Sequence, residues 1–119
     1  MNLMSNGSQC KCRNPESGLH SCPVGYNAIC IRGIDRKCNS DCIEIPATYS
    51  RRTDSFDEWI FETARDRVIE LLRLNSYSAS FLQVLKQKKL SNGGEITFQI
   101  PNAPTIYVNY SFKFENDEK

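Results

Sequence analysis

Cysteine is the residue type that carries most of the possible chemistry in this chain. The sequence of 119 residues holds six cysteines, and all of them lie in its first 42 residues: Cys10, Cys12, Cys22, Cys30, Cys38 and Cys42. An even number of closely spaced cysteines is typical of a disulfide scaffold in an oxidising compartment. The spacing therefore predicts disulfides among these six residues, but it does not select which of them pair.

A structural zinc site is the alternative interpretation of the same cysteines. Zinc takes four thiolate or imidazole ligands, usually supplied as closely spaced pairs. Cys10-x-Cys12 and Cys38-x3-Cys42 are possible pairs, and His20, the only histidine, is a possible additional ligand. Because the chain contains no C-x2-C pair, the sequence favours disulfides, and zinc is expected only if the cysteines are reduced.

His20 also suggests a thiol enzyme, in which Cys22 or Cys30 would be the nucleophile. The sequence does not indicate a third group that would orient such a pair, and clustered cysteines are normally bridged or ligated. It also has no phosphate-binding glycine loop, nucleophile elbow or zinc-protease helix. We therefore expect no enzymatic activity and assign no catalytic residue.

The charge balance argues against a nucleic-acid or membrane-surface protein. There are 15 Lys and Arg against 14 Asp and Glu, a net charge of +1, so no strong overall field attracts polyanions. The only basic cluster, Lys86-Gln-Lys-Lys89, is assigned to the end of a helix. No apolar run is long enough to span a membrane. The first nine residues lack a signal-peptide pattern, so the compartment stays undetermined, although the cysteine pattern suits an oxidising or extracellular setting.

The elements that must position these residues begin after a linker at residues 46–53. A capping box, Ser55-Phe-Asp-Glu58, predicts the start of a helix. A second helix is predicted from Ser76 or Ser78 to about Leu90, ended by Ser91-Asn-Gly-Gly94. The first helix is supported by apolar residues that repeat on one face: Phe56, Ile60, Ala64, Val68, Leu71 and Leu72.

Two strands are predicted near the C-terminus because apolar and polar residues alternate from Ile96 to Ile100 and from Ile106 to Phe114. Residues 101–104, with a proline at each end, predict the hairpin loop between them. The expected fold is α+β: a Cys-rich, cross-linked β-module at residues 1–46, followed by a domain with an α-α-β-β core at residues 47–119. The module needs cross-links because it is short of apolar residues.

Surface recognition is the expected function, either as a protein-binding module or as a small subunit of a larger assembly. Four residues are candidate partner contacts: Trp59 and Ile69, which lie off the main apolar arc of the first helix, and Tyr107 and Tyr110 on the last strand. The last strand, residues 105–114, is the expected exposed edge for pairing with a partner strand. The expected partner is a protein or further copies of the chain, with no nucleic acid and no membrane insertion. An intracellular zinc-stabilised interaction module is the alternative, and a thiol enzyme is a less favoured one.

Overall fold

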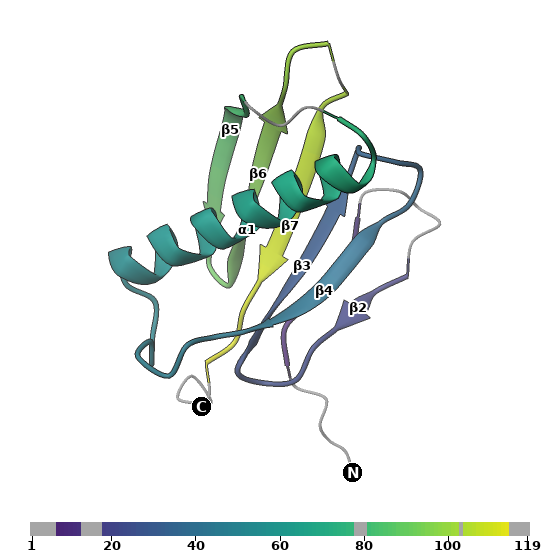
Figure 1. Ribbon diagram of the computed structural model, residues 1–119. Helices are drawn as coiled ribbons and strands as arrows, with labels where there is room; N and C mark the ends of the chain where they lie inside the picture. Colours follow the sequence, from purple (N-terminus) through teal and green to yellow (C-terminus); the bar gives the residue numbers. More distant parts are fainter. Residues whose placement is uncertain (1–6, 13–17, 78–80, 103, 115–119) are drawn as a thin grey trace.

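A five-stranded antiparallel sheet, crossed on one face by a long helix, is the framework of the protein (Figure 1). The computed structural model describes residues 7–12, 18–77, 81–102 and 104–114. In the described residues the elements are β1 (Gln9–Cys10), β2 (His20–Ser21), β3 (Tyr26–Arg32), β4 (Asn39–Glu44), α1 (Asp54–Leu74), β5 (Gln83–Leu90), β6 (Gly93–Gln99) and β7 (Ile106–Ser111). The order of strands in the sheet is β4-β3-β7-β6-β5, and β1 and β2 form a separate two-stranded hairpin.

The predicted first helix is confirmed as α1, but its cap lies at a different residue. Thr53 has extended backbone angles, and its side chain accepts a hydrogen bond from the Phe56 N–H at 3.1 Å. Ser55 is already inside the helix, so it cannot be the N-cap residue. The face of α1 that packs on the sheet is the predicted apolar one: Phe56, Ile60, Ala64, Val68 and Leu72 are all buried.

The predicted second helix is wrong, because residues 83–90 form strand β5, which pairs antiparallel with β6. All residues of β5 are exposed, so neither face of the strand is buried and no alternation of apolar and polar residues is required of it. Its Leu, Gln and Lys residues favour a helix intrinsically, and pairing with β6 overrides that preference. Ser78, one of the two proposed helix caps, lies outside the described residues.

Gly93 belongs to a sheet and does not end a helix. A two-residue turn at Ser91 and Asn92 joins β5 to β6, with Leu90 opposite Gly93. A Cβ atom on Gly93 would overlap the backbone carbonyl oxygen of Tyr110 on β7. Glycine is therefore required here by the close approach of two strands.

The predicted C-terminal hairpin is confirmed, since β6 and β7 pair antiparallel from Gly93 opposite Ser111 to Phe98 opposite Ile106. However, β7 is the central strand, with β3 on one side and β6 on the other. The prediction that the last strand is an exposed edge is therefore wrong, and the edges of the sheet are β4 and β5. The sequence could not show this, because β7 gains its second neighbour, β3, from a segment far away along the chain.

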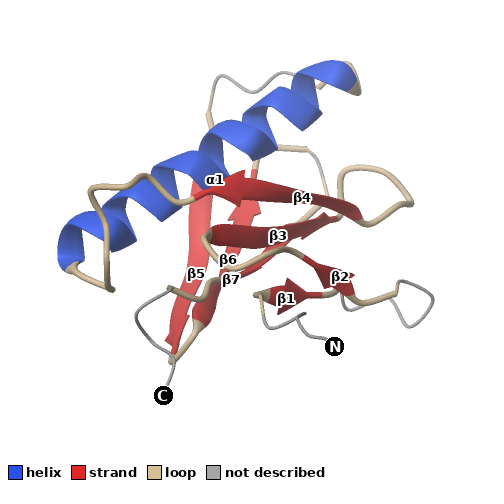
Figure 2. Cartoon of the chain, turned by 90° about the horizontal axis from the view of Figure 1, so that it is seen from below, coloured by secondary structure: helices blue, strands red, loops and turns tan. Residues whose placement is uncertain are grey.

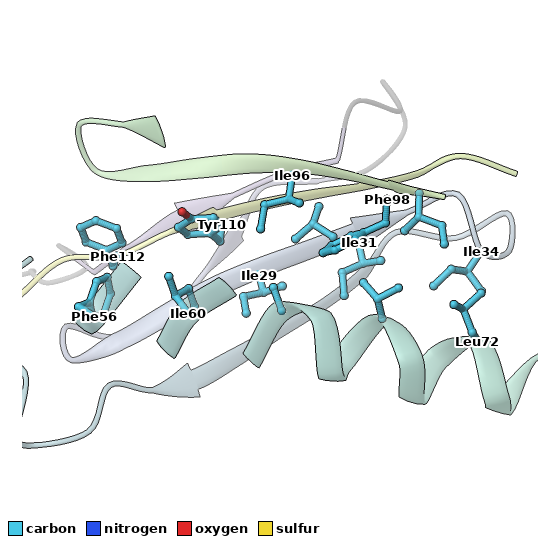
Figure 3. Close-up of a cluster of buried hydrophobic side chains, with 14 of the residues drawn as sticks. Ile29, Ile31, Ile34, Phe56, Ile60, Leu72, Ile96, Phe98, Tyr110 and Phe112 are labelled. Atoms are coloured by element: carbon cyan, nitrogen blue, oxygen red, sulfur yellow. The ribbon is translucent and has the colours of Figure 1, made fainter. Parts of the chain in front are cut away.

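Strands from the Cys-rich segment share one core with the rest of the chain. Ile29 and Ile31 of β3 pack in the same buried cluster as Phe56 and Ile60 of α1 and Phe98 of β6 (Figure 3). The α+β class is thus confirmed, with one helix in the described residues in place of two. The division into a module at residues 1–46 and a domain at residues 47–119 stays a prediction about independent folding.

Candidate functional site

Three disulfides bind the N-terminal hairpin to the sheet, as the cysteine spacing predicted. They are Cys10–Cys30, Cys12–Cys38 and Cys22–Cys42, with Cα–Cα distances of 6.1, 5.9 and 5.7 Å. All six cysteines are paired. The pairing, which the sequence left open, connects β1 to β3 and the end of β2 to β4. Three disulfides are consistent with an oxidising or extracellular setting.

The hairpin of β1 and β2 covers only part of the sheet face opposite α1 (Figure 2). It is tied to β7 by two hydrogen bonds: Ser111 Oγ donates to the Gln9 carbonyl at 2.6 Å, and Asn109 Nδ2 donates to the Lys11 carbonyl at 3.4 Å. These contacts hold it over β3 and β7. The described residues leave the same face of β5 and β6 uncovered.

A cavity of about 440 Å³ lies on this uncovered face, beside the Cys-rich hairpin. Its polar lining comes from strands that are neighbours in the sheet. Lys86 is opposite Thr97, Lys88 is opposite Glu95, and Tyr107 is opposite both Thr97 and Arg32. Directly opposed residues of an antiparallel pair project to the same face. We call the cavity the open-face groove and define it by Arg32, Lys86, Lys88, Glu95, Thr97 and Tyr107.

The open-face groove is basic, with three cations against the single carboxylate of Glu95. None of these four charged groups forms an ion pair within the described part of the chain. The guanidinium carbon of Arg32 lies 4.8 Å from the centroid of the Tyr107 ring, a cation–π distance. The buried Nε of Arg32 has no hydrogen-bond partner among the described residues. The groove therefore offers an anionic ligand unneutralised positive charge and a buried N–H donor.

Strand β5 continues this surface to the edge of the sheet. Among the described residues it pairs only with β6, so the backbone N–H and C=O groups on its other side are not taken up by another described strand and could accept an added one. Large apolar side chains are exposed on and beside it: Phe81, Val84, Leu85 and Leu90. Leu85 also lines the cavity. We call this edge, residues 81–90, the β5 edge. Lys86 and Lys88 belong to both the β5 edge and the open-face groove, so the two surfaces are continuous.

Only one of the four predicted partner contacts lies in the groove. Tyr107 is 37% exposed there, whereas Tyr110 is 3% exposed and lies in the core. Trp59 is partly buried and packs on Tyr49 and Phe56, with ring centroids 5.9 and 5.7 Å apart. Ile69 is also partly buried on α1. Since α1 covers the opposite face of the sheet, Trp59 and Ile69 cannot join Tyr107 in one surface.

The sequence contained a signal for the groove that the helix assignment concealed. Lys86 and Lys88 are two positions apart, a spacing that places side chains on one face of a strand but not of a helix. The interpretation of residues 86–89 as a helix end is therefore wrong: Lys86 and Lys88 lie on a strand and line the same cavity as Tyr107. The sequence around Arg32 did not indicate that it belongs to the groove, because only the pairing of β3 with β7 brings Arg32 into the groove.

His20, named from the sequence as a possible metal ligand or the partner of a thiol nucleophile, lies beside a disulfide. Its Nε2 atom is 3.5 Å from the Sγ atoms of both Cys22 and Cys42. These two sulfurs are bonded to each other, so neither is a thiolate nucleophile in this state. The expectation that the chain is not an enzyme stays a prediction.

Comparison with known proteins finds no match, whether to a family model, to a curated protein or to a solved structure. Within the described residues, no helix is long and apolar enough to cross a membrane. The functional argument therefore rests on the geometry of the open-face groove and the β5 edge.

Proposed function

We propose that this protein is a non-enzymatic recognition protein that binds an extended, acidic segment of a protein partner. The segment would lie along the β5 edge and reach into the open-face groove. The observation that carries the proposal is the position of Lys86 and Lys88: both line the groove from a strand whose outer edge pairs with no other strand in the described part of the chain.

Strand addition to β5 explains why an extended segment would fit. An added strand forms backbone hydrogen bonds with the edge, and its side chains alternate between the two faces of the sheet. Every second side chain would lie on the face of Lys86 and Lys88, where a carboxylate gains charge-assisted hydrogen bonds. The remaining side chains would lie on the other face, near Val84, which is 38% exposed. A segment in which acidic and apolar residues alternate meets both requirements.

A protein segment fits this surface better than a nucleic acid does. The groove holds only three cations, beside the carboxylate of Glu95, which is opposite Lys88 in the sheet. The net charge of the chain is only +1, whereas nucleic-acid affinity depends on many cations. The free backbone groups of the β5 edge match a peptide backbone. The absence of a nucleic-acid partner is thus part of the proposal.

The proposal is tested by titrating ¹⁵N-labelled protein with a synthetic peptide in which Glu and Val alternate. We expect amide chemical shifts to change along β5 and at Arg32 and Tyr107, and binding to weaken as salt is added. The variant Lys86→Glu/Lys88→Glu should weaken binding by about tenfold or more, because two attractive contacts become repulsive. Arg51→Glu/Arg65→Glu is the matched control: it changes the net charge by the same amount, at two exposed positions in the linker and α1. Its effect on peptide binding should be much smaller.

Three outcomes would contradict the proposal. Amide chemical-shift changes confined to α1 would show that the peptide binds on the helix-covered side of the sheet, away from the groove. An equal loss of binding in the control variant would show attraction to overall charge only. Tighter binding of a single-stranded oligonucleotide than of the peptide, lost in Lys86→Glu/Lys88→Glu, would identify a nucleic-acid groove instead.

A further inference from the structure

A second cluster of chemically active side chains lies away from the open-face groove, at the disulfide between β2 and β4. His20 is in β2, Cys22 follows that strand, and Cys42 is in β4. The imidazole Nε2 and the two sulfurs all lie within 4.8 Å of one another. Cys22 is buried, whereas His20 and Cys42 are partly exposed. Solvent therefore reaches the cluster from the side of His20 and Cys42.

We propose that reduction of the Cys22–Cys42 bond converts this cluster into a binding site for one soft divalent metal ion of the zinc type. The ligands would be the two thiolates and Nε2 of His20, with a fourth position open to water. The other two disulfides stay intact and keep the hairpin on the sheet. The site would thus be closed to metal in the oxidised protein and open in the reduced one.

Two of the three ligand-to-ligand distances of such a zinc site are already present in the oxidised protein. In a tetrahedral zinc centre the Zn–S bonds are about 2.3 Å and the Zn–N bonds about 2.0 Å, which places nitrogen and sulfur ligands about 3.5 Å apart. His20 Nε2 lies 3.5 Å from each of the two sulfurs. The two sulfurs, which are bonded to each other, would have to separate to about 3.8 Å, the distance between two thiolates on one ion. Only one of the three ligand-to-ligand distances has to change.

The other cluster of sulfurs does not offer an equal site. The sulfurs of Cys12, Cys30 and Cys38 also lie within 4.8 Å of one another, but they belong to two different disulfides. Both bonds would have to break before three thiolates were available, and no imidazole belongs to that cluster. In the His20 cluster, reduction of the single Cys22–Cys42 disulfide makes both thiolate ligands available.

The chemistry needs a reductant, and a water-soluble phosphine supplies it without binding the metal through sulfur. One phosphine and one water give one phosphine oxide and two thiols, so phosphorus is oxidised and both sulfurs are reduced. In the disulfide form Cys22 Sγ lies 3.8 Å from the Asp41 carbonyl oxygen and Cys42 Sγ lies 3.8 Å from that of Ser21, so each sulfur has a carbonyl acceptor nearby for the S–H group that reduction would create. The ion then displaces one proton from each thiol to solvent, and neutral His20 binds through its Nε2 lone pair.

The test uses the full chain, limiting phosphine and Co²⁺ as a coloured probe. We expect one ion per chain by native mass spectrometry, with thiolate-to-cobalt charge-transfer absorption that appears only after reduction. Alkylation followed by peptide mapping should show Cys22 and Cys42 modified without metal and protected with it. His20→Gln should weaken cobalt binding by about tenfold or more, since it removes one ligand.

The double variant Cys22→Ser/Cys42→Ser is the matched control, because it keeps two disulfides and the imidazole but should bind no ion under the same conditions. It also keeps the test valid if His20→Gln does not fold. The proposal is overturned if metal protects Cys12, Cys30 or Cys38 in place of Cys22 and Cys42. It is equally overturned if His20→Gln binds cobalt as tightly as the parent chain, or if free Cys22 and Cys42 thiols bind none.

Discussion

Two tyrosines of one strand show how strongly position determines what a residue can do. Tyr107 and Tyr110 lie on opposite faces of β7: the first is 37% exposed and lines the open-face groove, and the second is 3% exposed in the core. Burial raises the pKa of the Tyr110 phenol above its ordinary value of 10.0; nearby Arg52 opposes that rise and Asp57 adds to it. Tyr110 therefore keeps its proton in the folded protein at a pH at which the unfolded chain loses it.

This difference predicts a loss of stability in alkaline solution. Above pH 10, the ordinary tyrosine pKa, the unfolded state binds fewer protons at Tyr110 than the folded state, so the free energy of unfolding falls as the pH rises. Denaturant unfolding from pH 8 to pH 11 measures this fall, and it should be smaller in Tyr110→Phe than in the parent chain. Tyr107→Phe, which removes the phenol oxygen of the exposed tyrosine on the same strand, is the control. Identical pH dependence in both variants would contradict the prediction.

Between elements, Arg52 of the linker fastens the start of α1 to the turn between β5 and β6. Its Nε lies 2.9 Å from Asp57 Oδ1, and its guanidinium donates to the carbonyl oxygens of Leu90 and Gly93. Lys89 Nζ approaches the same carboxylate at 3.3 Å. The residues predicted from sequence to be a linker without regular structure thus carry a polar connection between helix and edge strand.

Removal of this connection should destabilise the fold. In Arg52→Ala we expect the free energy of unfolding to fall by about 2 kcal/mol, because a charged hydrogen-bond donor is lost and the partly buried Asp57 carboxylate loses its nearest cation. Arg51→Ala, at an exposed neighbour, should change it by less than about 0.5 kcal/mol. Chemical denaturation measures both values. Equal effects of the two substitutions would show that the contacts of Arg52 contribute nothing.

At the scale of the whole molecule, the Cys-rich segment and the later elements share one sheet and one core. The central strands β3 and β7 come from the two sides of the predicted boundary at residue 46, and they are hydrogen-bonded from Ala28 opposite Ser111 to Arg32 opposite Tyr107. Ile29 and Ile31 are buried in the core that α1 covers. A chain that began at residue 47 would lose a central strand and expose the apolar side chains that pack on it.

We therefore expect unfolding in a single cooperative transition. The fluorescence of Trp59 on α1 and the NMR signals of β3 amides should be lost at the same denaturant concentration. Cys10→Ser/Cys30→Ser should lower the free energy of unfolding by about 3 kcal/mol and preserve the single transition. Separate transitions for α1 and β3 would instead support two independently folding units.

The sequence by itself determined the features that have a local physical cause. The period of apolar residues specified α1, alternation specified β6 and β7, and the density of cysteines predicted disulfides. Tyr107 is the only groove residue that was also predicted as a partner contact, because only exposure on a strand was needed to propose it.

The tertiary structure decided everything that depends on pairing between distant segments. The conformation of β5, the central place of β7, the disulfide connectivity and the meeting of Arg32 with Lys86, Lys88 and Tyr107 all belong to this group. The physical reason is that strand conformation and neighbours are fixed by hydrogen bonds between segments far apart in the sequence, which no local period records. The six cysteines that dominate the sequence are consequently anchors of a hairpin, and the open-face groove lies beside that hairpin on strands that carry no cysteine except Cys30.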